Sequence, residues 1–142
     1  MDQWKMMMAM GNDSFHQQSW LDAEQSYYQA VDIIEDLWND DAENIELLQA
    51  WIAGQHNLSS LFERQGLECE ALRYLTIPHQ RVLSLINQGA CSMPFHHALM
   101  LTAKITLHPL LDFSQRNPIC DGCLAGLKLS KEWLSTPIHQ FH

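Results

Sequence analysis

Residues 11–34 read GNDSFHQQSWLDAEQSYYQAVDII, and they predict the end of one helix, a tight turn and a second, amphipathic helix. Ser19 and Asp22 form a pair similar to a capping box, which marks the N-terminus of a helix. Beyond the turn, apolar and small residues recur every three or four positions and form one helical stripe: Trp20, Ala23, Tyr27, Ala30, Val31, Ile34 and Trp38. The stretch therefore predicts two antiparallel helices in contact.

The same spacing of apolar residues continues on both sides of this stretch and predicts about six helices in the whole chain. No segment alternates polar and apolar residues for long enough to predict a strand. The expected helices cover about residues 2–17, 19–38, 41–65, 68–87, 94–109 and 118–134. The sequence therefore predicts an all-α protein.

Caps and prolines set the expected boundaries of these helices. Asp40 or Asp41 should cap the third helix, because a short side-chain oxygen can accept the first free backbone amides. Pro78 should kink the fourth helix, since its ring removes a backbone donor and crowds the preceding turn. Pro109 should kink or stop the fifth helix for the same reason. The Asn-Pro pair at residues 117–118 is typical of a helix start.

Length and charge limit the class of protein. A chain of 142 residues can bury the core of one domain, expected at residues 1–136 with a loose tail at residues 137–142. The net charge of −9 is uneven: residues 1–50 contain eleven acidic side chains and one basic one, and residues 51–142 contain six and seven. An acidic half opposes binding to the phosphates of nucleic acids and favours a basic partner surface.

The apolar runs are too short for a membrane protein. None approaches the roughly 20 residues that span a bilayer. The run at residues 6–10 is also shorter than the roughly 7–15 apolar residues at the centre of a signal peptide. Four cysteines are too few for a disulfide scaffold, so we expect reduced thiols. The sequence therefore predicts a cytoplasmic protein without membrane contact.

A related pattern of residues returns 48 positions later in the chain. When Ala23 is aligned with Ala71, Gly11 is aligned with Ser59. In each copy a small residue on one helix precedes a small residue on the next helix by twelve positions, and an apolar side chain follows four positions later. Small residues at these places allow two helix backbones to approach closely. The pattern therefore predicts two related pairs of helices.

This pattern resembles the tetratricopeptide repeat, a helical hairpin with small and bulky residues at these spacings. The residues that carry the resemblance are Gly11, Trp20, Ala23, Tyr27 and Ala30 in the first copy, and Leu58, Ser59, Phe62, Gly66 and Ala71 in the second. It covers about residues 4–80, and about residues 94–135 lack a recognisable signature. The copies lie 48 residues apart rather than about 34, and Pro78 stands where the first copy has Ala30. The resemblance implies three antiparallel hairpins in a right-handed superhelical array.

In this family the first helix of each hairpin lines a concave groove that binds peptides, so the resemblance implies a non-catalytic interaction module for a protein or peptide partner. Carried over by register, the groove residues are Lys5, Met8, Asn12, Phe15, His16, His56, Asn57, Ser60, Glu63 and Arg64. The methionine-rich run at residues 6–10 fits either flexible core filling or an adaptable binding surface. Exposed apolar residues at the ends of a short array could instead form a homo-oligomer.

Cys120 and Cys123 form the one motif that suggests chemistry. Two thiolates at this spacing can bind a metal ion or form a disulfide, and His96 and His97 are further ligand candidates. A metal-binding or thiol-redox protein is therefore the alternative function. However, no second pair of cysteines has this spacing, and the sequence contains neither a glycine-rich phosphate loop nor a serine nucleophile motif. We therefore expect no enzyme activity and no cofactor.

Overall fold

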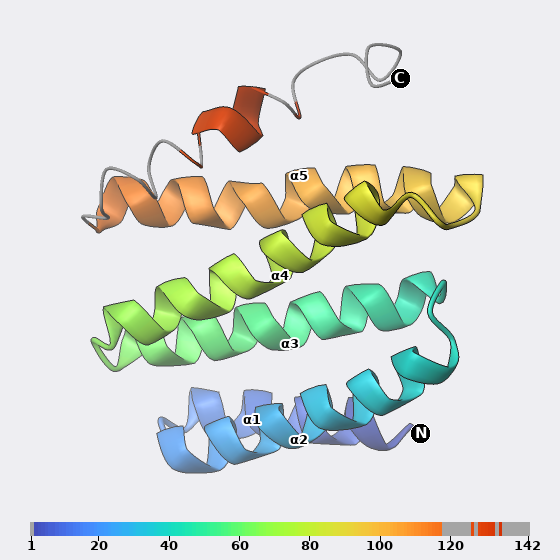
Figure 1. Ribbon diagram of the computed structural model, residues 1–142. Coiled ribbons are helices and arrows are strands. Elements are labelled where there is room, and N and C mark those ends of the chain that lie inside the picture. The colour runs from blue at the N-terminus through green and yellow to red at the C-terminus, as the bar shows by residue number, and fades with distance from the viewer. Residues whose placement is uncertain (1, 118–125, 127, 133, 135–142) are drawn as a thin grey trace. The chain divides into compact units, whose positions relative to one another are not determined.

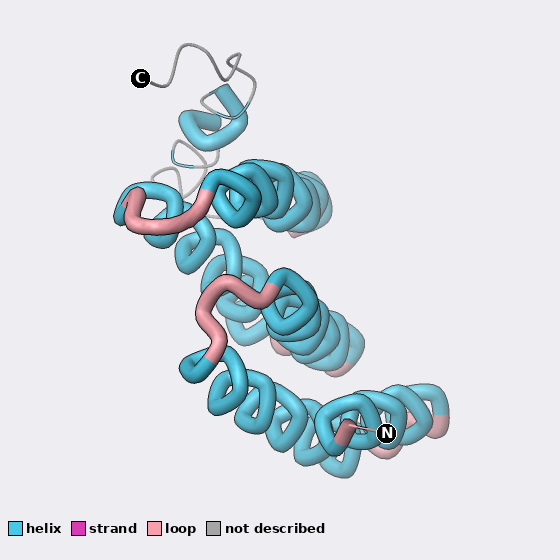
Figure 2. Tube along the Cα trace, turned by 90° about the vertical axis from the view of Figure 1, so that its right-hand side faces the viewer, coloured by secondary structure: helices cyan, strands magenta, loops and turns pink. Residues whose placement is uncertain are grey.

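The computed structural model describes residues 2–117, 126, 128–132 and 134 (Figure 1). The chain divides into two compact units, residues 1–77 and residues 78–142. All regular secondary structure among the described residues is helical, as Figure 2 shows, and the predicted all-α class is confirmed for that part of the chain. Among the same residues, no helix has the length and apolar character needed to cross a membrane.

The first unit is built around α2. Its helices are α1 (Gln3–His16), α2 (Trp20–Asp40), α3 (Ile45–Arg64) and the first part of α4 (Glu68–Gln88). α2 packs against α1 and against α3 (Figure 1). The predicted stripe of α2 is buried from Ala23 to Trp38, whereas Trp20 at its start is half-buried. The hydrophobic period of this helix therefore identified its buried face correctly.

Two glycines set the close spacing on the two sides of α2. A β-carbon added to Gly11 of α1 would lie 2.5 Å from the ring of Tyr27. A β-carbon added to Gly54 of α3 would lie 2.7 Å from Cγ2 of Val31. Real β-carbons do not approach other atoms so closely without a shift of the surrounding structure. The small residue predicted at Gly11 is therefore required for contact between α1 and α2.

The turns after α1 and α3 have the same backbone hydrogen bonds at positions 48 residues apart. Gln18 and Gly66 hold equivalent left-handed positions, with φ of 61° and 77°. Each donates its amide to the carbonyl three residues earlier, at 3.0 Å in both turns. The next residue donates to the carbonyl five residues earlier, at 2.8 Å after α1 and 2.9 Å after α3. Both turns are therefore Schellman motifs, which satisfy the last free carbonyls of a helix.

Polar and aromatic contacts join α3 and α4 within the first unit. The buried Ser59 hydroxyl on α3 donates a hydrogen bond of 2.7 Å to the Ala71 carbonyl on α4. The ring of Phe62 stacks on the ring of Tyr74, with centroids 5.5 Å apart. The Tyr74 hydroxyl lies 2.6 Å from that of Tyr28 on α2, and burial is the main reason why the pKa of Tyr28 is raised. These contacts bring α2, α3 and α4 together.

Two predicted helix caps are wrong. Ser19 precedes α2, but its side chain makes no capping hydrogen bond, because its backbone belongs to the Schellman turn and is not extended. Neither Asp40 nor Asp41 caps α3, which has Asn44 as its cap; the Asn44 side chain accepts a hydrogen bond of 3.1 Å from the amide three residues later. α2 continues to Asp40 because the buried Trp38 holds its last turns on the core.

The second unit contains residues 78–88 of α4, the long helix α5 (Met93–Arg116) and a C-terminal helical segment, here defined as residues 126, 128–132 and 134. α5 does not stop at Pro109 but continues to Arg116. Leu107, Leu110 and Phe113 are buried on both sides of the proline, so packing holds the helix together where one backbone hydrogen bond is missing. The predicted start of the last helix at Pro118 lies outside the described residues.

His79 is the central polar residue of the second unit, with 4% of its surface exposed. Its Nδ1 lies 2.9 Å from Thr106 Oγ1, and its Nε2 lies 3.4 Å from Ser130 Oγ. The Thr106 hydroxyl donates to the Ala103 carbonyl at 3.1 Å, so Nδ1 carries the proton and Nε2 accepts one from Ser130. Burial lowers the pKa of His79 and favours this neutral form. The contacts connect α4, α5 and the C-terminal helical segment.

Candidate functional site

The residues predicted to line a groove lie on α1 and α3, and side chains of these two helices meet near the N-termini and in the middle. The Lys5 ammonium lies 3.6 Å from the carboxylate of Glu46 and 3.6 Å from that of Asp2. All three side chains are substantially exposed, so these ion pairs add little stability. Farther along, the sulfur of Met8 lies 4.0 Å from the place of a β-carbon on Gly54.

Phe15, Trp20 and Arg64 form a cluster at the other end of these helices, called here the aromatic–arginine cluster. The two aromatic rings meet edge to face, with centroids 5.6 Å apart. The Arg64 guanidinium lies 5.6 Å from the Phe15 centroid and 6.0 Å from the Trp20 centroid, within cation–π range. Because Lys5 meets Glu46 at one end and Phe15 meets Arg64 at the other, α1 and α3 lie side by side and run in the same direction.

Trp20 is a candidate functional residue that the sequence analysis assigned to a different role. The helical spacing predicts it on the buried stripe of α2, but it is only half-buried and packs against Phe15. Its exposure could have been predicted from its position in the first turn of a helix, directly after a tight turn. A residue there has few neighbours to cover it. Arg64 is exposed, so the aromatic–arginine cluster keeps a surface that a partner can reach.

The other predicted residues of α1 have different surroundings. Asn12 is turned toward α2, where its Oδ1 accepts a hydrogen bond of 2.7 Å from the Tyr27 hydroxyl. Tyr27 is itself buried, and burial raises its pKa. Met8 is half-buried, and His16 is exposed with its ring edge to face with that of Phe15 at 6.0 Å. Asn12 therefore orients a core tyrosine, whereas His16 extends the surface around Phe15.

The predicted residues of α3 are mostly half-buried. This holds for His56, Asn57 and Glu63, whereas Ser60 is exposed. The Nε2 atom of His56 is buried and has no hydrogen-bond partner among the described residues. Burial also lowers the pKa of His56, so its imidazole is neutral near pH 7. A partner could reach this nitrogen only after a local shift, so His56 is a weaker candidate for direct contact than Phe15.

The residues of the alternative metal or redox site are only partly described. Cys120 and Cys123 lie outside the described residues, while His96 is half-buried and His97 exposed near the start of α5. Cys69 and Cys91, which belong to different units, have free thiols. Within the part of the chain that the structure describes, no three His, Cys, Asp or Glu side chains are grouped closely enough to hold a metal ion. The metal or redox function stays a prediction.

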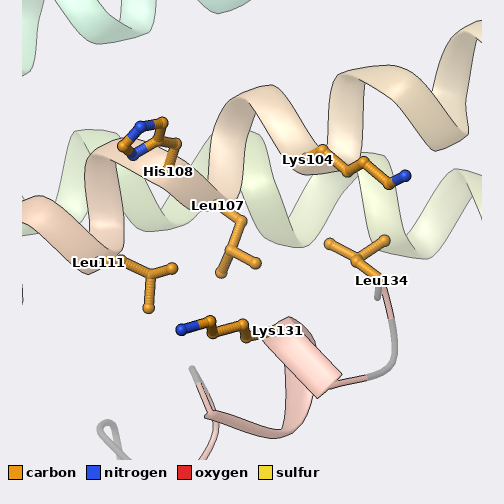
Figure 3. Close-up of a pocket in the computed structure, with 6 residues that line it drawn as sticks. All are labelled: Lys104, Leu107, His108, Leu111, Lys131 and Leu134. Atoms are coloured by element: carbon orange, nitrogen blue, oxygen red, sulfur yellow. The ribbon is translucent and has the colours of Figure 1, made fainter. Parts of the chain in front are cut away.

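The second unit contains a pocket of about 410 Å³ between α5 and the C-terminal helical segment, which the sequence analysis did not predict (Figure 3). It is lined by Lys104, Leu107, His108, Leu111, Lys131 and Leu134. Figure 3 shows the three leucines directed toward one space, with the amino groups of the two lysines toward its opposite ends. The four lining residues of α5 lie on one face of that helix. The sequence of one helix can predict only one wall of a pocket, and the second wall comes from a segment that is distant in the chain.

Comparison with known proteins identified a family but no individual relative. The family described as "Protein of unknown function (DUF2753)" matches residues 2–141 of the chain. Neither the curated proteins nor the solved structures gave a match. The family match includes both units, with the aromatic–arginine cluster of the first and the pocket of the second.

Proposed function

The chain belongs to the DUF2753 family of proteins of unknown function, and we propose that its first unit is a non-catalytic module that binds a protein or peptide segment. The binding surface is the one that α1 and α3 form side by side, with the aromatic–arginine cluster as its anchor. The observation that carries the proposal is this cluster of a phenylalanine, a tryptophan and an arginine that remains partly exposed. Tryptophan and arginine are enriched among the residues that dominate the energy of protein interfaces.

The proposed architecture is a right-handed, tetratricopeptide-like array of three antiparallel hairpins in the cytoplasm. Support comes from the two Schellman turns, which repeat the same hydrogen bonds 48 residues apart. Further support comes from Gly11 and Ser59, which hold equivalent positions 48 residues apart. Gly11 lies against the Tyr27 ring of α2, and Ser59 hydrogen bonds to the Ala71 carbonyl of α4. In such an array the first helix of each hairpin lines the binding surface, which is the place of α1 and α3.

The charge of the first unit favours a partner with basic side chains. Residues 1–77 contain fourteen acidic and three basic side chains, which gives a net charge of −11. Such a charge speeds association with a positively charged partner and opposes polyanions. The half-buried aromatic rings of the cluster add apolar contact area. The proposed partner is therefore a protein segment with both apolar and basic residues.

The test compares wild type with the double variant Phe15→Ala/Arg64→Ala in a pull-down from a lysate of the native host. Captured proteins are identified by mass spectrometry, and the affinity of the purified partner is then measured by calorimetry. Removal of two anchor residues should weaken that affinity by about tenfold or more, since residues of this kind contribute about 2 kcal/mol or more at interfaces.

Leu21→Ala is the matched control, because Leu21 is 73% exposed and follows Trp20 in the chain without belonging to the cluster. Circular dichroism confirms that each variant is folded. A partner held equally by wild type and the folded double variant would show that the aromatic–arginine cluster is not the binding anchor. Loss of the partner from the double variant alone supports the interaction module.

A further inference from the structure

The pocket of the second unit combines an apolar interior with two basic side chains at its rim. Leu107 and Leu134 are 5% and 3% exposed, and Leu111 is half-buried, so the walls are hydrocarbon. Lys104 and Lys131 are exposed, and their amino groups lie toward the two ends of the space between the leucines (Figure 3). Long lysine stems can lie along an apolar wall while the ammonium group stays in water. A ligand with a hydrocarbon body and an anionic end matches this arrangement.

The charge balance of the second unit supports an anionic ligand. Residues 78–142 contain three acidic and five basic side chains, a net charge of +2, against −11 for the first unit. Two of the five basic residues line the pocket. The third polar lining residue, His108, has its Nδ1 3.5 Å from the Asp112 carboxylate, so that acidic group is directed at the histidine on its own helix. Lys104 and Lys131 are therefore the basic groups of the lining, and the Asp112 carboxylate lies beside His108 without being part of the lining.

The second wall of the pocket is attached to the core of its unit. Ser130 hydrogen bonds to the buried His79, and Leu134 is itself buried, so the residues on both sides of Lys131 are held in place. The pocket volume of about 410 Å³ also lies within the roughly 300–1,000 Å³ that is typical of small-molecule sites. The site is therefore formed before a ligand arrives and is of small-molecule size.

We propose that this pocket binds a medium-length aliphatic carboxylate. Its hydrocarbon chain lies among Leu107, Leu111 and Leu134, and its carboxylate pairs with the ammonium of Lys104 or Lys131. Hydrocarbon contact supplies most of the affinity, because burial of apolar area is the dominant favourable term. The lysines select an acid over a neutral compound of the same length.

The first experiment titrates the full chain with octanoate and follows backbone amide NMR signals. Saturable shifts at Leu107 and Leu111 are expected with octanoate. Octanol, which lacks the charge, should bind about two- to fivefold more weakly, as expected for one solvent-exposed ion pair. Acetate, which lacks the chain, should produce no saturable shift. Equal binding of octanoate and octanol, or no saturable binding of octanoate, would overturn the proposal. If acetate bound with the same affinity as octanoate, the site would recognise only the charged group, and the proposal would also be overturned.

The second experiment assigns the charge selection to particular lysines. Lys104→Met and Lys131→Met keep an apolar stem and remove the charge, so together they should abolish the preference for octanoate over octanol. Lys128→Met is the matched control, since Lys128 is an exposed lysine of the same helical segment that does not line the pocket. An equal loss of preference in the Lys128 variant would contradict the assignment. Phe15→Ala/Arg64→Ala should bind octanoate like wild type, so failure of this site and failure of the proposed interaction module are distinguishable.

Discussion

At the scale of single residues, Gln18 and Gly66 allow a comparison of two residue types in equivalent backbone positions. Both have a left-handed φ, which costs a residue with a β-carbon about 1–2 kcal/mol. Glycine avoids this cost but loses more conformational entropy on folding. Gln18→Gly should therefore raise the free energy of unfolding by about 0.5–1 kcal/mol, and Gly66→Gln should lower it by a similar amount, as measured by urea denaturation.

Gln17→Gly is the matched control for these two variants. Gln17 precedes the left-handed residue and has a φ of −84°, so glycine brings no relief of strain there. This control should lower the free energy of unfolding or leave it unchanged. If Gln18→Gly and Gln17→Gly had the same effect, strain at Gln18 would not be the cause.

Gly11 provides a second prediction at this scale. Gly11→Ala should lower the free energy of unfolding by about 1–3 kcal/mol, because the new methyl group would overlap the Tyr27 ring. The ring cannot move away easily, since it is buried and its hydroxyl is bound to Asn12. Gly126→Ala is the control, because a β-carbon there meets nothing within 4 Å. Thermal unfolding of both variants checks the prediction, which fails if Gly11→Ala is as stable as wild type.

At the scale of helices, Ser59 connects α3 to α4 through its hydrogen bond to the Ala71 carbonyl. Ser59→Ala should lower the free energy of unfolding by about 1 kcal/mol, because a buried hydrogen bond is lost while the packing is nearly kept. The neighbouring exposed Ser60 supplies the control Ser60→Ala, for which we expect almost no change. Chemical denaturation of the pair gives the difference. Equal stability of the two variants would mean that this hydrogen bond contributes nothing to the contact.

At the scale of the whole molecule, each unit contains a neutral histidine that is at least half-buried, and stability should depend on pH. Burial lowers the pKa of His56 and His79 below their ordinary value of 6.5. In the unfolded chain both return to about 6.5, so the unfolded state binds more protons once the pH falls through that value. The free energy of unfolding should therefore decrease as the pH is lowered from about 7.5 to below 6.5. Urea unfolding at a series of pH values measures this slope.

Variants assign the pH dependence to these two groups. His56→Asn and His79→Asn, each still folded, should have a smaller loss of stability on acidification than wild type, because asparagine does not titrate. His97→Asn is the control, since His97 is exposed. An unchanged slope in both the His56 and His79 variants would show that other groups cause the acid sensitivity.

Helical periodicity in the sequence predicted the all-α class and the buried stripe of α2. Helical periodicity is a local property, so Ala23, Tyr27 and Ile34 identify a buried face without knowledge of its partner. The turn at Gly66 was also predictable, because glycine is the residue that favours a left-handed helix end. The turn at Gln18 lacks that signal. The cap at Asn44 was missed because several polar residues before α3 can cap a helix, and only the packing of α2 decides which one does.

Which distant side chains meet depends on how the helices pack, and the sequence pattern did not predict it. Phe15, Trp20 and Arg64 come from three helices, and the register proposed from the sequence contained two of them but placed the tryptophan in the core. The pocket on α5 was not predictable, because its walls are separated in the chain and each alone is an ordinary helical face. The physical reason is the same in both cases. Local propensity sets the path of a helix, but a site between helices depends on their spacing and register, which arise from the packing of many residues at once.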